Sequence, residues 1–128
     1  MAKNFISLEH DSAIKHVTGK AIYTDDIIEP KNLLHAAIGY SKISCGEIIK
    51  IDFTEVINSK GVIDIITEKD IEGENEVGPV FVGDPIFTSK KIKYHGQPIF
   101  AVAATSYKLA KKAASKVKIK FKEIRPIL

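Results

Sequence analysis

The chain has 128 residues, 45% of them hydrophobic and 27% charged, a composition that fits one globular domain with one core. Its apolar runs fall far short of the roughly 20 residues needed to span a bilayer, and residues 1–12 lack the apolar core of a secretory signal, so no membrane association is expected. Cys45 is the only cysteine, which excludes an internal disulfide and favours a reducing, cytoplasmic location.

The formal net charge of +3 hides an asymmetry along the chain. Residues 1–89 contain 8 lysines and 15 acidic residues, whereas residues 90–128 contain 10 lysines, Arg125 and one acid, Glu123. This basic final third is interpreted either as a solvated lysine face or as a docking surface for an acidic partner. Nucleic acid is not expected as a partner, because phosphate recognition usually draws on arginine.

Short strands are predicted in the first part of the chain, after a start with little periodicity. A strand is expected at residues 21–23 and another over residues 33–40. A third strand begins at Gly46, with Ile49 and Ile51 on one side. These strands are expected to contribute to a sheet.

The next segment predicts a short helix, a strand and a long loop. Thr54 is expected to cap the helix at its N-terminus, and Gly61 to close it in the left-handed conformation. Residues 62–67 are almost wholly apolar, which indicates a central strand. Residues 68–85 are rich in glycine and proline, so a long loop or irregular excursion is predicted there.

Two further short strands are expected at residues 86–87 and 92–94. Residues 99–104 are an uncharged apolar run, which suits a strand covered on both faces. Its pairing should begin just after Pro98, because proline cannot donate a hydrogen bond. Thr105-Ser106 then offers a hydroxyl to cap a helix.

That helix is predicted to bury a seam of alanines. Ala110, Ala113 and Ala114 recur with Val117 at helical spacing, and lysines fall on the opposite side. Alanine lets backbones approach closely, so the helix should lie directly against another element. From Val117 to Phe121 apolar residues alternate with lysines, which predicts a strand with one buried face and one face in water.

These elements include too few helices for a doubly wound sheet. The fold class is therefore α+β, a mixed or mainly antiparallel sheet with one short and one longer helix, in a single domain over residues 1–128. The core is expected to draw apolar side chains from most of these elements. Its predicted members are Leu33, Ile38, Ile49, Ile51, Val56, Ile63, Ile65, Ile99, Val102, Ala113, Val117, Ile119 and Phe121.

Two sets of residues that include histidines are candidates for chemistry, and neither predicts a site. Glu9-His10-Asp11 with His16 could supply metal ligands, but the spacing matches no standard site and no second cluster follows. Cys45 could act as a nucleophile with His16, His35 or His95, but nothing in the adjacent sequence activates its thiol. His95 is the histidine best suited to an edge that another molecule approaches.

Two other motifs also fail as sites. Residues 73–78 have the glycine spacing of a phosphate loop, but Pro79 stands where lysine is required and two glutamates would repel phosphate. Asp25-Asp26 should point apart, so they are expected to tie down a loop by accepting backbone N–H bonds. No catalytic, cofactor-binding or metal residue is therefore predicted.

A series of segments together resembles the opening of the molybdenum-binding subunit of xanthine dehydrogenases and aldehyde oxidases. The longest are HVTGKAIYTDDI at residues 16–27 and GQPIFAVAA at residues 96–104. The others, in the order and near the spacing of that family, are residues 34–41, 61–62, 70–75, 77–80, 83–85 and 126–128. They cover nearly the whole chain, and the nearest resemblance is to the bacterial type with a separate molybdenum subunit.

The resemblance implies the α/β-hammerhead domain that begins that subunit. It also implies an oxidoreductase that hydroxylates purines or aldehydes with water-derived oxygen and passes electrons through 2Fe-2S clusters to FAD. In that family the ligands of the molybdopterin-type molybdenum cofactor and the catalytic residues lie beyond this domain, so none is carried over. The implied partners are the rest of the molybdenum subunit and the iron–sulfur and FAD subunits.

The chain ends where that family continues. We therefore expect a structural N-terminal fragment of a longer subunit that is inactive by itself. The alternative is a free-standing interaction module that binds an acidic partner through its basic final third.

Overall fold

The computed structural model describes residues 10–78, 80 and 82–125, and the chain divides into two compact units, Met1–Lys31 and Asn32–Leu128. The expectations for Glu9, Pro79 and residues 126–128 lie outside the described residues. Each unit is described by itself. That residues 1–128 form a single domain stays a prediction.

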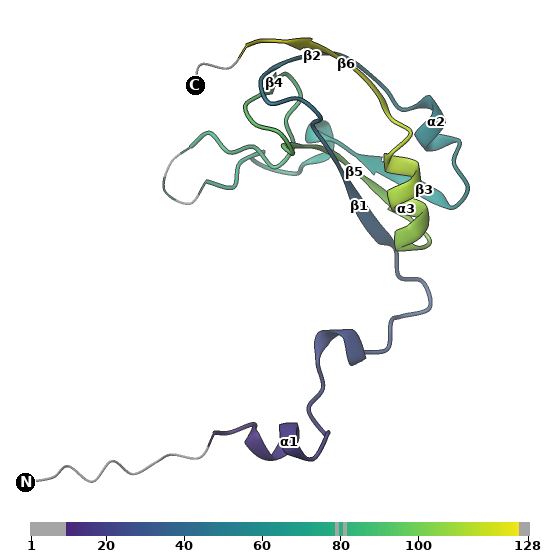
Figure 1. Cartoon of the computed structure of the whole chain (residues 1–128). Coiled ribbons are helices and arrows are strands. Elements are labelled where there is room, and N and C mark those ends of the chain that lie inside the picture. Colours follow the sequence, from purple (N-terminus) through teal and green to yellow (C-terminus); the bar gives the residue numbers. More distant parts are fainter. Residues whose placement is uncertain (1–9, 79, 81, 126–128) are drawn as a thin grey trace, which may run out of the picture. The chain divides into compact units, whose positions relative to one another are not determined.

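The first unit contains α1 (Ala13–Val17) and a 3-10 helix (Thr24–Asp26), as Figure 1 shows. The strand predicted at residues 21–23 was wrong, because the backbone N–H of Tyr23 donates to the Asp26 carboxylate at 3.0 Å and starts the 3-10 turn. None of the described side chains of this unit is buried. Local hydrogen bonds, rather than a core, therefore hold its turns.

The second unit contains two antiparallel sheets, which confirms the α+β class. Sheet A has the order β1 (His35–Tyr40), β5 (Pro98–Ala104) and β3 (Val62–Ile66). Sheet B has the order β4 (Lys91–Ile92), β2 (Gly46–Asp52) and β6 (Lys118–Glu123). Figure 1 shows β6 running beside β2, and α3 in front of sheet A.

The longer helix, α3 (Tyr107–Ala114), follows the sequence prediction closely. Ser106 caps it, since its Oγ accepts the N–H of Leu109 at 3.4 Å. Ala110, Ala113 and Ala114 are its buried residues. The alanine seam therefore lets α3 lie directly on β1 and β5.

The short helix α2 (Thr54–Ile57) begins one residue earlier than predicted. Thr54 is its first residue rather than its cap, and Asp52 supplies the capping acceptor. Asp52 Oδ1 accepts the Thr54 hydroxyl at 2.6 Å and the Thr54 N–H at 2.9 Å. These two bonds lower the pKa of Asp52. Gly61 has the predicted positive φ of 79°, but it does not close α2, because the C-cap of that helix is Asn58.

The centre of sheet A is β5, not residues 62–67 as predicted. β3 pairs only with β5 among the described residues, so it is an edge strand. Its pairing shifts between Val62 and Asp64, and a residue such as Asp64 is tolerated where one face stays open. The uninterrupted apolar run of β5 suits the position between two strands. Residues 86–87 form no strand, and β4 is the only strand between β3 and β5 in the described part of the chain.

The buried apolar side chains of the second unit form one cluster. Its members are Ala37, Val56, Ile92, Ile99, Phe100, Val102, Ala104, Ala110, Ala113 and Ala114. The predicted core residues Ile51, Ile65, Val117, Ile119 and Phe121 are half-buried and pack against it. The cluster therefore joins the inner face of sheet A, both helices and sheet B.

The core prediction was wrong for four residues, which are exposed: Leu33, Ile38, Ile49 and Ile63. Leu33 precedes β1, and Ile38 lies on the face of β1 opposite the buried Ala37. Register shifts in β2 and β3 turn Ile49 and Ile63 outward, because one extra residue reverses the side-chain alternation.

Candidate docking surfaces

The histidines near the start of the chain make local contacts. The Ser12 N–H donates to His10 Nδ1 at 3.1 Å, and His16 Nδ1 lies 2.8 Å from the hydroxyl of Tyr23. Among residues 10–78, 80 and 82–125, no group of three or more His, Cys, Asp or Glu side chains is placed to hold a metal ion. His16 thus serves to brace Tyr23.

The candidate nucleophile and its histidines come from separate elements. Cys45 is half-buried in the turn before β2, and its backbone carbonyl accepts the N–H of Ile124 at 3.1 Å. His35 begins β1, whereas His95 is exposed in the turn before β5. Cys45 therefore serves the backbone connection between β2 and the end of β6.

The loop with phosphate-like glycine spacing holds its own carboxylate. Glu76 Oε1 accepts the N–H groups of Gly78 at 2.9 Å and Asp84 at 2.8 Å, and Oε2 accepts that of Gly83 at 2.8 Å. These bonds, that of Gly78 first, lower the pKa of Glu76. Backbone donors that a phosphate would need are thus already engaged. The glycine spacing serves a carboxylate-braced loop.

The paired acids at residues 25 and 26 have the expected local role. Asp26 accepts the N–H of Tyr23, as described above. Both acids lie in the first turn of the 3-10 helix, where carboxylates favour the positive end. This bears out the expectation for Asp26, whereas for Asp25 it stays a prediction.

Sheet A has one face under helices and one open face. The contacts of α3 with β1, β5 and β3 cover the face that carries Ala37 and Val102. On the other face Ile38 and Ile66 flank Ala101 in one row across the three strands. Ile38 is 44% exposed and Ile66 36% exposed. We define the open face as Ala36, Ile38, Asp64, Ile66, Ala101 and Ala103, which share this side by register.

The open face is suited to close approach by another protein surface. Its central positions, Ala101 and Ala103, are small, while larger isoleucines stand on both neighbouring strands. Asp64 is its one charged residue. Ala101 is itself buried, so Ile38 and Ile66 are the aliphatic side chains that this face presents to another protein surface.

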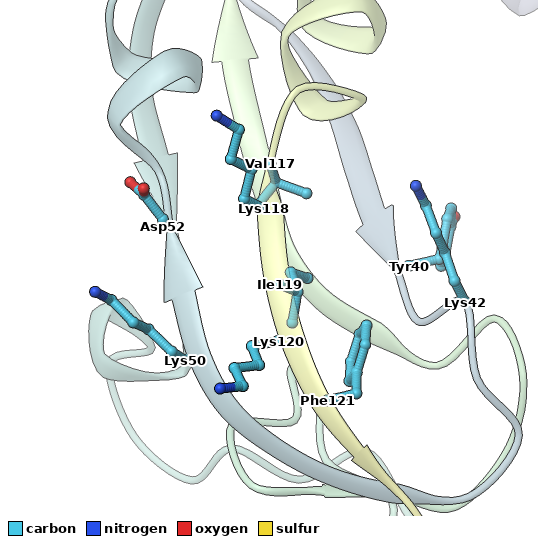
Figure 2. Close-up of a pocket in the computed structure, with 9 residues that line it drawn as sticks. All are labelled: Tyr40, Lys42, Lys50, Asp52, Val117, Lys118, Ile119, Lys120 and Phe121. Atoms are coloured by element: carbon cyan, nitrogen blue, oxygen red, sulfur yellow. The ribbon is translucent and has the colours of Figure 1, made fainter.

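A second surface, the lysine groove, lies along β6. A cavity of about 460 Å³ is bounded by Tyr40 at the end of β1, by Lys42 just after it, and by Ile119 and Phe121 on β6. Lys50 on β2 and Lys120 on β6 complete the six residues by which we define the lysine groove. Figure 2 shows Ile119 and Phe121 pointing from β6 toward Tyr40 and Lys42.

Sequence patterns did not reveal the open face. Ile38 and Ile63 were predicted inside because large aliphatic residues are usually buried, whereas β1 buries its small residues instead. The alternation of Ala36, Ile38 and Tyr40 with Ala37 and Gly39 was the available signal. This alternation could not show which face of the strand the alanine-rich helix would cover.

The second unit is thus a small α+β unit of two antiparallel sheets with helix α3 packed on one of them. Residues 18–125 match the family model described as "Aldehyde oxidase and xanthine dehydrogenase, a/b hammerhead domain". The chain belongs to this family of oxidoreductases, which confirms the resemblance seen in the sequence. In the described residues no helix is both long and apolar enough to cross a membrane.

Individual relatives agree with this assignment. Xanthine dehydrogenase of Calliphora vicina is 39% identical over 120 residues, a match that covers 93% of this chain and 9% of the relative. Aldehyde oxidase 3 of Mus musculus is 38% identical with the same coverage. The crystal structure of the aldehyde oxidoreductase from Desulfovibrio desulfuricans aligns with a TM-score of 0.84 and 32% identity, covering 93% of this chain and 14% of that one. The chain thus spans about a tenth of these curated relatives.

Proposed function

We propose that this chain is the N-terminal hammerhead domain of a larger molybdenum-dependent oxidoreductase subunit. Its role there is structural, and it contributes no catalytic residue. The substrates of the whole enzyme are purines or aldehydes, hydroxylated with water-derived oxygen. The single observation that carries the proposal is the open face, where Ile38 and Ile66 stay substantially exposed on either side of the buried Ala101.

The length of the relatives supports the same proposal. The chain matches 9% of a curated relative and 14% of a solved chain, so most of each of these proteins lies outside the matched domain. In such a protein the remaining part is available to pack against the domain. Ile38 and Ile66 would each contribute roughly 25 cal/mol per Å² of apolar area removed from water. The remainder of the molybdenum subunit is therefore the proposed occupant of the open face, and iron–sulfur and FAD subunits are the further partners.

The described residues do not fit a molybdenum site of their own. They present no group of three or more His, Cys, Asp or Glu side chains that could hold a metal ion. The one loop with phosphate-like spacing directs backbone N–H groups at Glu76 rather than at a ligand. No step of the reaction is accordingly assigned to residues of this chain.

The test has two readouts. An antiserum against the 128 residues should detect a native polypeptide several-fold larger than 14.1 kDa in a lysate of the source organism. The purified chain alone should not reduce a dye with purines or aldehydes. A native band near 14 kDa would contradict the fragment proposal, and dye reduction by the chain alone would contradict the structural role.

A second candidate function is docking of an acidic partner. It is favoured by the concentration of lysines in the final third of the chain and by their exposure on β6. Binding of this kind weakens steeply with salt, because the Debye length falls from about 10 Å at 0.1 M to about 3 Å at 1 M. A partner captured equally well at low and high salt would exclude it.

A further inference from the structure

The lysine groove combines a cavity with an open strand edge. β2 pairs with one side of β6, and the described residues place no strand on the other side. The side chains of Ile119 and Phe121 on the same strand point toward Tyr40 and Lys42 across the cavity, as Figure 2 shows. The backbone groups along an edge strand are a template for pairing with another chain.

The charges along β2 and β6 leave one pair unbalanced. Asp52 lies opposite Lys118, and Glu47 lies opposite Lys122. Between these two complementary pairs, Lys50 lies directly opposite Lys120. Like charges in directly opposed positions destabilise a sheet, and an anionic group between them would relieve that repulsion.

Other contacts distinguish these lysines from their neighbour on β6. Lys118 forms an ion pair with Glu55, which raises the pKa of Lys118. No ion pair is found for Lys42, Lys50 or Lys120 within the described part of the chain. Lys42, Lys50 and Lys120 are among the residues that line the same cavity as Asp52 and the apolar Ile119 and Phe121. The groove therefore offers positive charge and apolar surface together.

The charge pattern also decides what can occupy the edge. A second copy that paired through its own β6 would bring Lys118, Lys120 and Lys122 against the same residues of its partner. Lysines on an edge strand oppose this kind of self-association. An acidic strand would instead place carboxylates beside the lysines and its alternate side chains over Ile119 and Phe121.

We propose that the lysine groove binds an extended acidic segment of another polypeptide, which pairs with the free edge of β6. Carboxylates of this segment lie beside Lys120 and in the positive field of Lys50 on the next strand, and its alternate apolar side chains enter the cavity. The inference rests on the acidic-partner function proposed above and narrows it to one groove. It does not depend on the open face, so a result that contradicts binding at one of the two surfaces leaves the proposal for the other unchanged.

The experiment uses the 128-residue chain and a fluorescent peptide about as long as β6, in which glutamate alternates with valine. Fluorescence anisotropy should show binding at low salt that is lost at high salt. Lys120→Glu and Lys50→Glu should each weaken binding about tenfold, the equivalent of about 1.4 kcal/mol. The matched control is Lys111→Glu, because Lys111 is exposed on α3 and outside the groove. It should change affinity less than twofold.

Two further arms test the mode of binding. A peptide N-methylated on the amides that would face β6 should bind about tenfold more weakly, because it cannot pair with a strand edge. The Lys50→Gln, Lys120→Gln variant removes the charges without reversing them and keeps the test valid if a glutamate variant fails to fold. Two results would contradict binding at the lysine groove: an equal loss of affinity in the Lys111→Glu control, or undiminished binding of the methylated peptide. Neither result would contradict docking of an acidic partner elsewhere on the chain. Absence of peptide binding even at low salt would overturn both.

Discussion

The two faces of β1 in sheet A reverse the usual relation between size and burial. On the covered face β1 presents Ala37 and Gly39, both buried, while on the open face it presents the larger Ile38. The covered face needs small residues because α3 lies directly on it and Phe100 crosses beneath Gly39. The open face has no such limit. The comparison teaches that packing of β1 depends on close approach by its small residues, whereas its larger apolar side chain, Ile38, remains available for another surface.

The largest effect is expected on the covered face, from Gly39→Ala. A Cβ at residue 39 would lie 2.1 Å from Cζ of Phe100. That ring is fully buried and meets Phe53 edge-on at 5.0 Å, so it cannot easily move. We expect a loss of about 3 kcal/mol in the free energy of unfolding, measured by urea denaturation.

A double-mutant cycle checks the cause. Phe100→Leu shortens the side chain, so adding Gly39→Ala to that variant should cost clearly less than adding it to the original chain. Additive losses would show that the clash with Phe100 is not the reason for the glycine.

The next largest effect concerns the helix that covers this face. Ala113→Leu should destabilise the chain by about 1–3 kcal/mol, because Ala113 is buried in the seam between α3 and the sheet. The matched variant Lys112→Leu places the same side chain on the exposed side of α3 and should leave folding nearly unchanged. Thermal melting of both variants makes the comparison. Equal shifts in Tm would mean that α3 does not use its alanines for packing.

Periodicity predicted the covered face better than the rest of the fold. The alanine seam, the apolar run of β5 and the alternation of β6 depend on residues close together in the chain, and all three were confirmed. The register shift between Ile48 and Lys50 in β2 depends on a partner strand about 70 residues away, so no local pattern could reveal it.

The candidate surfaces were predicted unevenly for the same reason. The lysines of β6 stood out in the sequence because lysine occurs at every second residue of this strand. Ile38 and Ile66 could be recognised as one surface only after both had been paired with Ala101. An open face is a property of three strands, and none of them shows it alone.

A smaller effect is expected where polar bonds replace packing, in the loop held by Glu76. Its pKa is lower in the folded chain than the ordinary value of 4.5, chiefly because of the Gly78 N–H. The unfolded chain therefore binds the proton more readily, so this stabilisation is complete above about pH 4.5 and is lost as the pH falls through the lowered pKa.

Glu76→Gln tests this loop contribution. The variant should be less stable than the original chain at pH 7, and the difference should shrink toward pH 3, measured by urea denaturation across that range. Glu74→Gln is the control, because Glu74 is an exposed acid of the same loop. A difference that stays constant with pH would show that the Glu76 carboxylate does not stabilise the loop through its charge. The stability of the chain would then depend on packing, without a contribution from the charge of this carboxylate.

The smallest effect on folding is expected on the open face, from Ile38→Gln. Its side chain is substantially exposed, so the free energy of unfolding of the 128-residue chain should change by less than about 0.5 kcal/mol. Val102→Ala, in the central strand of the same sheet but on the covered face, should cost about 2 kcal/mol. In the larger subunit proposed above, the order should reverse for assembly, since Ile38→Gln would place an amide in an apolar interface without a partner. Size-exclusion chromatography of that subunit with its partners supplies the measurement. Normal assembly of Ile38→Gln, together with strong destabilisation of the 128-residue chain, would mean that the open face is part of this unit's own core.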